Sequence, residues 1–146
     1  MSPNNFFTVY VPYPYDGYLY MGAIIGNPAN GNNFGSGTSN SFAFLGKSDP
    51  VPEGPPSTAT GNSYRDSITL SGLGVETALW SYDTATTVRT PTWINENGDR
   101  VTAYVMYDNW NGAFFITGQS PLLAPGLPIS PDPVTFTCVL PVPLDD

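Results

Sequence analysis

The sequence predicts an all-β protein, a single domain over residues 1–146 built as an antiparallel β-sandwich or a Greek-key barrel with long Pro/Gly-rich loops. Apolar and polar residues alternate along the central stretch from Leu79 to Gly118, with the period of 2 that is typical of strands. The chain also contains 15 glycines and 16 prolines, which interrupt helices and mark turns. No long stretch free of Gly and Pro has a helical period, so helices are not expected.

The central stretch predicts a meander of antiparallel strands. Its four expected strands are Leu79–Asp83, Thr87–Ile94, Val101–Tyr107 and Ala113–Thr117. In the third strand, the alternation puts Val101, Ala103, Val105 and Tyr107 on one face and Thr102, Tyr104 and Met106 on the other. Asn97-Gly98 precedes this strand and Asn111-Gly112 follows it, and Asn-Gly favours the type I′ hairpin turn. Trp80 and Trp93 lie within strands and are expected to pack in the core.

Other parts of the chain supply further strands and two long loops. The predicted strands are Asn5–Val11, Leu19–Ile25, Ser41–Leu45, Ser67–Ser71 and Val134–Leu140. The loops Asn27–Asn40 and Lys47–Ser63 are longer than most loops of compact domains and are expected to be functional or mobile. In the first loop, only Phe34 could contribute to a core. The C-terminal tail, 141–146, is expected to be frayed.

The charge and the apolar content exclude several classes of partner. The formal net charge is -8 with only four basic residues, so the chain cannot neutralise nucleic-acid phosphates and would be repelled by anionic membranes. No apolar run approaches the ~20 residues of a membrane span. The N-terminal residues MSPNNFF lack the pattern of a signal peptide, so we expect an acidic, soluble protein in the cytoplasm, or one released without a leader.

The residue types present also argue against catalysis. The chain has no histidine and one cysteine, Cys138, which excludes histidine-based nucleophilic pairs and zinc sites and leaves no partner for an internal disulfide. Cys138 alternates with apolar residues and is expected to be a core thiol. Nearly every acidic residue sits at a predicted turn, where a turn-stabilising role accounts for it. We therefore expect no enzyme, no cofactor and no metal, and we interpret Asn95–Asp99 as a hairpin turn rather than a calcium loop.

The turn from Tyr107 to Gly112 is the candidate ligand site. Its sequence, Tyr107-Asp108-Asn109-Trp110-Asn111-Gly112, places an indole between amide and carboxylate side chains at a hairpin tip. The apolar face of a sugar ring stacks on an aromatic ring, while carboxylates and amides pair with its hydroxyl groups. A second candidate surface is a tyrosine-rich segment near the N-terminus, from which we select Tyr15 and Tyr18.

These features together predict a non-catalytic carbohydrate-binding protein, a lectin, that binds glycans by aromatic stacking and by Asp/Asn hydrogen bonds. A homo-oligomer is expected, because lectins gain avidity from multivalency. The alternative is a structural or assembly protein, such as a virion decoration protein or a filament subunit. The low charged fraction, 11%, and the Pro/Gly-rich loops would suit burial against neighbouring copies.

Overall fold

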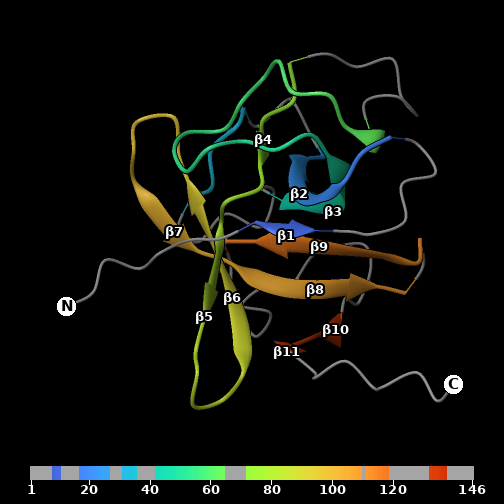
Figure 1. Ribbon diagram of the computed structural model, residues 1–146, viewed down its shortest axis with the longest axis vertical. Coiled ribbons are helices and arrows are strands. Elements are labelled where there is room, and N and C mark those ends of the chain that lie inside the picture. Colours follow the sequence, from blue (N-terminus) through green and yellow to red (C-terminus); the bar gives the residue numbers. More distant parts are fainter. Residues whose placement is uncertain are drawn as a thin grey trace, which may run out of the picture.

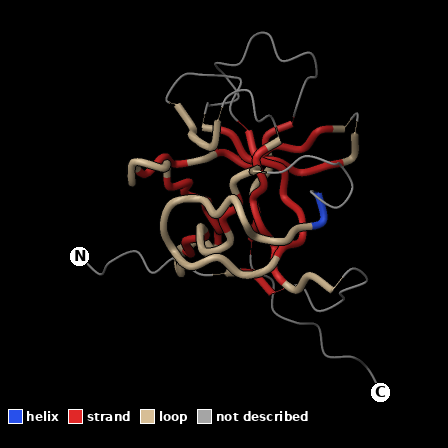
Figure 2. Tube along the Cα trace, turned by 90° about the horizontal axis from the view of Figure 1, so that it is seen from above, coloured by secondary structure: helices blue, strands red, loops and turns tan. Residues whose placement is uncertain are grey.

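The protein is a β-sandwich in which two antiparallel sheets pack together (Figure 1). The structure is a computed structural model that describes residues 8–10, 17–26, 31–35, 42–64, 72–109, 111–118 and 132–137. Within these ranges, helical geometry is confined to Ser63 and Tyr64, the short blue piece in Figure 2. No helix in the described part of the chain is long and apolar enough to cross a membrane. Of the two predicted all-β architectures, the sandwich is the one observed.

The larger sheet has the strand order β1-β2-β3-β9-β8-β10, and β4 also pairs with β2. Its strands are β1 (Val9–Tyr10), β2 (Tyr20–Ile25), β3 (Phe42–Ser48), β4 (Val75–Glu76), β8 (Tyr104–Asp108), β9 (Ala113–Thr117) and β10 (Asp132–Pro133). β1 pairs with β2 at Tyr20 and Met21, and β4 pairs with β2 at Ala23 and Ile24. The two short strands β1 and β4 therefore follow one another along β2.

The smaller sheet is centred on β6. It contains β5 (Trp80–Tyr82), β6 (Val88–Ile94), β7 (Arg100–Thr102) and β11 (Phe136–Thr137). β6 pairs with β5, β7 and β11, in each case antiparallel. The hairpin of β5 and β6 extends towards the lower end of the molecule in Figure 1.

Two segments of the chain connect the sheets, because each contributes one strand to one sheet and its next strand to the other sheet. β7 pairs with β6 in the smaller sheet, and after Ala103 the chain continues as β8 in the larger sheet. Similarly, β10 pairs with β8, and β11 then pairs with β6. Backbone bonds hold both crossings, since Ala103 N donates to Pro91 O and Val134 N donates to Val105 O, each at 3.0 Å. The sheets are thus linked by hydrogen bonds as well as by packing.

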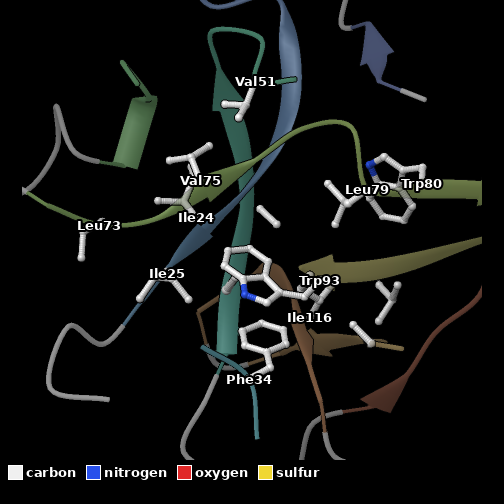
Figure 3. Close-up of a cluster of buried hydrophobic side chains, with 14 residues drawn as sticks. Ile24, Ile25, Phe34, Val51, Leu73, Val75, Leu79, Trp80, Trp93 and Ile116 are labelled. Carbon is white, nitrogen blue, oxygen red and sulfur yellow. The ribbon is translucent and has the colours of Figure 1, made fainter. Parts of the chain in front are cut away.

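The register of the larger sheet explains the position of the core. Paired residues share a face, so Ile25, Ala43, Ile116 and Val105 form one row across β2, β3, β9 and β8. This row belongs to the buried cluster that also contains Trp80 and Trp93 (Figure 3). Both indoles are fully buried, which confirms the prediction that they pack in the core.

The opposite face of the larger sheet is also apolar. The neighbouring row across the same four strands consists of Ile24, Phe44, Phe115 and Met106. The Tyr64 ring covers part of this face, with its centroid 5.3 Å from that of Phe44. The larger sheet therefore lies between two apolar layers, and the second one is important for the candidate site.

Most predicted strands are observed, and β10, which precedes the predicted last strand, was not expected. β2, β3, β5, β6 and β9 match predicted strands within a few residues, and β1 and β11 are short parts of the predicted first and last strands. The predicted strand Val101–Tyr107 is instead divided at Ala103 between the two sheets. β4 was not predicted, because the sequence around it reads as a Gly-rich turn. The predicted strand Ser67–Ser71 and Cys138 lie outside the described residues.

The predicted type I′ geometry at both Asn-Gly turns is wrong. A type I′ turn needs a positive φ at both central residues, but among the described non-glycine residues only Thr87 has one. Gly98 (φ +89°) ends a three-residue hairpin loop, in which Gly98 N donates to Asn95 O and Asn95 N donates to Asp99 O, both at 2.8 Å. The turns lie where predicted, but glycine alone supplies the left-handed conformation.

The described part of the first long loop, residues 31–35, is a structural element. The Phe34 ring stacks on Trp93, with centroids 4.7 Å apart and planes 12° from parallel (Figure 3). Phe34 N donates to Asn95 Oδ1 (2.7 Å), and Asn95 Nδ2 donates to Phe34 O (2.9 Å). The expected core role of Phe34 is confirmed, and this part of the loop is held firmly against the β6–β7 hairpin.

Candidate functional site

The turn between β8 and β9 is organised by the buried carboxylate of Asp108. Asn111 N donates to Asp108 Oδ1 (3.2 Å), and Asn111 Nδ2 donates to Asp108 Oδ2 (2.6 Å). Gly112 N donates to Asp108 O at 2.9 Å, and Gly112 adopts a φ of +67°. These bonds fix the backbone of the turn and the orientation of the Asn111 amide, while Asn109 and Asn111 stay exposed.

A pocket of about 450 Å³ lies next to this turn, and we call it the turn pocket. Its lining includes Ile24, Phe44, Gly46, Ser63, Tyr64 and Asn111. It lies on the second apolar face of the larger sheet, between β3, the Ser63–Tyr64 segment and the β8–β9 turn. The structure therefore brings the predicted turn together with segments that are distant in the sequence.

The turn pocket combines aromatic rings with uncharged polar groups. The Phe44 and Tyr64 rings are tilted by 51° to one another. Ser63 Oγ accepts a hydrogen bond from Lys47 N (3.1 Å), and a hydroxyl that accepts can also donate. No described residue of the lining is charged. This chemistry suits a neutral ligand that has an apolar face and hydroxyl groups at its edge.

Gly46 keeps the floor of the pocket open. A Cβ atom at this position would lie 3.1 Å from Ile24 Cδ1 and 3.2 Å from Ser63 Oγ. A side chain at position 46 would therefore occupy the space between Ile24 and Ser63. The pocket depends on a residue without a side chain at the centre of β3.

The predicted site residues do not all face this pocket. Asn111 lines it, whereas Asp108 is buried beneath the turn with its carboxylate bound to Asn111. Tyr107 contacts Phe114, with ring centroids 5.0 Å apart. Tyr18 is half-buried beside Gly61, where a Cβ atom would lie 3.1 Å from the tyrosine ring. Trp110 and Tyr15 lie outside the described residues, so their roles remain predictions.

Of the lining residues, sequence reasoning predicted only Asn111, and it missed the two aromatic rings and the hydroxyl group of Phe44, Tyr64 and Ser63. Phe44 belongs to a predicted strand, but nothing in the strand pattern shows which segment covers it. Ser63 is the last residue of the predicted loop Lys47–Ser63, Tyr64 follows it, and neither residue belongs to a motif. A pairing between β3 and β9 would have been needed to bring Phe44 close to the Asn111 turn.

The segment Asn95–Asp99 has the bonding of a hairpin turn. Asp99 N donates to Asn97 Oδ1, and Asn97 Nδ2 donates to Asp99 Oδ2, both at 2.9 Å. Within the described ranges, no three His, Cys, Asp or Glu side chains lie together as a metal site would require.

Comparison of the chain with protein-family models, with curated proteins and with solved structures finds no match.

Proposed function

We propose that this protein is a non-catalytic carbohydrate-binding protein and that a neutral saccharide binds in the turn pocket. The observation that carries the proposal is the meeting of two aromatic rings, Phe44 and Tyr64, with the Asn111 amide and the Ser63 hydroxyl around one pocket. Its volume of about 450 Å³ lies within the usual range for small-ligand sites.

The physical argument follows from the two kinds of surface that a pyranose presents. Its C–H face packs on aromatic rings, as the face of an apolar ligand would. Its hydroxyl groups exchange hydrogen bonds with amides and hydroxyls, which can both donate and accept. The Asn111 amide is held by Asp108, so little side-chain entropy is lost when a ligand binds.

Trp110 extends the proposal. This residue stands between Asn109 and Asn111 in the sequence, so we assign its indole to the same ligand as an additional stacking surface. We also propose that the protein acts as a homo-oligomer, which would raise its avidity for glycans that carry several copies of the recognised sugar.

A glycan array followed by titration calorimetry tests the proposal. Tyr64→Ala should weaken binding of the best array glycan by about fivefold or more, because stacking on a ring contributes roughly 1 kcal/mol beyond the buried area. Tyr82→Ala is the matched control: Tyr82 is 42% exposed on β5 and does not line the pocket. Circular dichroism should show both variants folded.

Two results would contradict the proposal. One is an array on which no glycan binds the folded protein. The other is a glycan whose affinity is unchanged by both Tyr64→Ala and Trp110→Ala. Absence of glycan binding together with sedimentation of the purified chain as large, regular assemblies would instead favour the structural or assembly role.

A further inference from the structure

A second hollow lies at the other end of the β8–β9 hairpin, and we call it the polar cleft. Its volume is about 670 Å³, and its lining includes Phe34, Asp99, Arg100, Thr102, Tyr104 and Gly118. The cleft and the turn pocket share no lining residue. β8 runs from Tyr104 at the cleft to Asp108 at the turn, a separation of roughly 14 Å at about 3.4 Å per residue. The two hollows are therefore separate places on the molecule.

The polar cleft presents one exposed aromatic ring among hydroxyl and charged groups. Arg100, Thr102 and Tyr104 occupy alternate positions along the chain where it passes from β7 to β8, so their side chains project on the same side. The Tyr104 side chain is 42% exposed, and Thr102 is exposed beside it. A ring with neighbouring hydroxyl, carboxylate and guanidinium groups is suited to a ligand with many hydroxyl groups.

The local charges argue against an anionic ligand. Arg100 Nη2 donates to Glu53 Oε1 at 2.8 Å, so a carboxylate already balances the positive charge of the guanidinium. Asp99 adds a further negative charge next to Arg100, and the whole chain carries a formal net charge of -8. An anion entering the cleft would meet repulsion, whereas a neutral polyhydroxylated ligand would not.

The walls of the cleft are held by contacts within the protein. Phe34 is stacked on Trp93, and both backbone polar groups of Phe34 are bonded to Asn95. A Cβ atom on Gly118 would lie 3.3 Å from Gly35 O and 3.3 Å from Val101 Cγ1. The loop and the end of β9 therefore meet closely at the base of the cleft, and binding would require little rearrangement.

We infer that the polar cleft is a second saccharide site, for neutral sugars, with the Tyr104 ring as its stacking surface. The inference rests on the proposed carbohydrate-binding function, to which it adds a second site on each chain. A single chain could then bridge two glycans, independently of any oligomer.

Site-resolved NMR titration tests the inference. The probes are neutral methyl hexopyranosides and lactose, with glucuronate as the anionic counterpart, added to the ¹⁵N-labelled full chain. The neutral probe that binds should shift the amides of Thr102 and Tyr104 as well as those of Ser63 and Asn111. Tyr104→Ala should weaken the binding measured at the cleft amides by about tenfold and leave the turn-pocket amides responsive. Thr102→Val, which removes one hydroxyl with little change of shape, should weaken the same response, and Tyr82→Ala should not.

The outcomes separate the two proposals. Shifts at the turn-pocket amides alone would overturn the second site and leave the proposed function intact. Shifts at the cleft amides alone would support the cleft and overturn the turn pocket. The absence of shifts in both sets would overturn both. Glucuronate binding at the cleft as tightly as the neutral probes would overturn the selectivity for neutral sugars.

Discussion

Glu76 shows how a single buried residue can set the pH response of the protein. Its side chain is 3% exposed on β4, and Oε1 accepts a hydrogen bond from Ile94 N at 2.9 Å. Burial raises the pKa of Glu76 from 4.5 to about 9, although the bond from Ile94 and the positive charge of Arg100 both act to lower it. Glu76 is therefore a neutral carboxylic acid in the folded protein at neutral pH.

This shift predicts that stability falls as the pH rises. Between pH 4.5 and 9, the folded chain holds a proton on Glu76 that the unfolded chain releases, so folding is favoured most at the acid end of this window. From pH 5 to pH 8 the loss is on the order of 4 kcal/mol, because each pKa unit corresponds to about 1.4 kcal/mol. Glu76→Gln, which resembles the neutral acid, should remove most of this slope in urea unfolding measured at several pH values.

The exposed acid Glu53 provides the control. Glu53→Gln removes a surface ion pair with Arg100, so the pH slope should stay close to that of the unmodified chain. Equal slopes for Glu76→Gln and the unmodified chain would show that Glu76 is already ionised in the folded state.

At the scale of elements, Asn95 attaches the loop segment 31–35 to the end of β6. Its amide bonds the N–H and the carbonyl of Phe34, as a neighbouring strand would. Asn95→Ala would leave both buried groups without these partners, and each such group costs roughly 1–3 kcal/mol. We expect the free energy of unfolding to fall by about 3 kcal/mol in urea titrations followed by far-UV circular dichroism.

Asn97→Ala is the matched control in the same hairpin. Asn97 is exposed, and its amide bonds with the neighbouring Asp99 within the turn, so we expect a loss below about 1 kcal/mol. If the two variants lost the same stability, the segment 31–35 would not be anchored through Asn95. Because Phe34 and Asn95 line the polar cleft, Asn95→Ala should also weaken saccharide binding there more than in the turn pocket.

Alternation along the chain predicted strands more reliably than it predicted their partners. β9 was predicted with its observed bounds, since a short apolar run, Ala113–Ile116, begins after Asn111-Gly112 and ends just before Gly118. The strand predicted over 101–107 changes sheets at Ala103, yet its side chains continue to point alternately to opposite faces. This alternation is a property of the extended backbone and does not depend on which strand is the hydrogen-bonding neighbour. β4 has two residues and is defined by its pairing with β2, which no local pattern reports.

For the candidate site, the sequence predicted the turn but not the residues that pack opposite it. Asn and Gly residues marked the turn at Asn111, and the turn lies where the sequence placed it. The residues opposite Asn111 in the turn pocket come from β3 and from the Ser63–Tyr64 segment, so they depend on long-range packing. Asp108 also looked like an exposed ligand group, because local sequence does not reveal that its carboxylate points beneath the turn.

At the scale of the whole molecule, the two crossings between the sheets should make them unfold together. β7 and β8 form one continuous segment shared by both sheets, and a second such segment contains β10 and β11. Neither sheet can separate without breaking hydrogen bonds at these crossings, such as the bond from Ala103 N to Pro91 O. The buried cluster also draws side chains from both sheets.

Native-state hydrogen exchange measures this coupling directly. The Thr92 amide donates to Leu79 O in the smaller sheet, and the Ile25 amide donates to Gly74 O in the larger one. If the sheets form one cooperative unit, both amides should exchange with the same opening free energy, equal to the global value from urea unfolding. A clearly lower value for Thr92 would mean that the smaller sheet opens alone, and the wall of the polar cleft supplied by Asp99, Arg100 and Thr102 would then open with it.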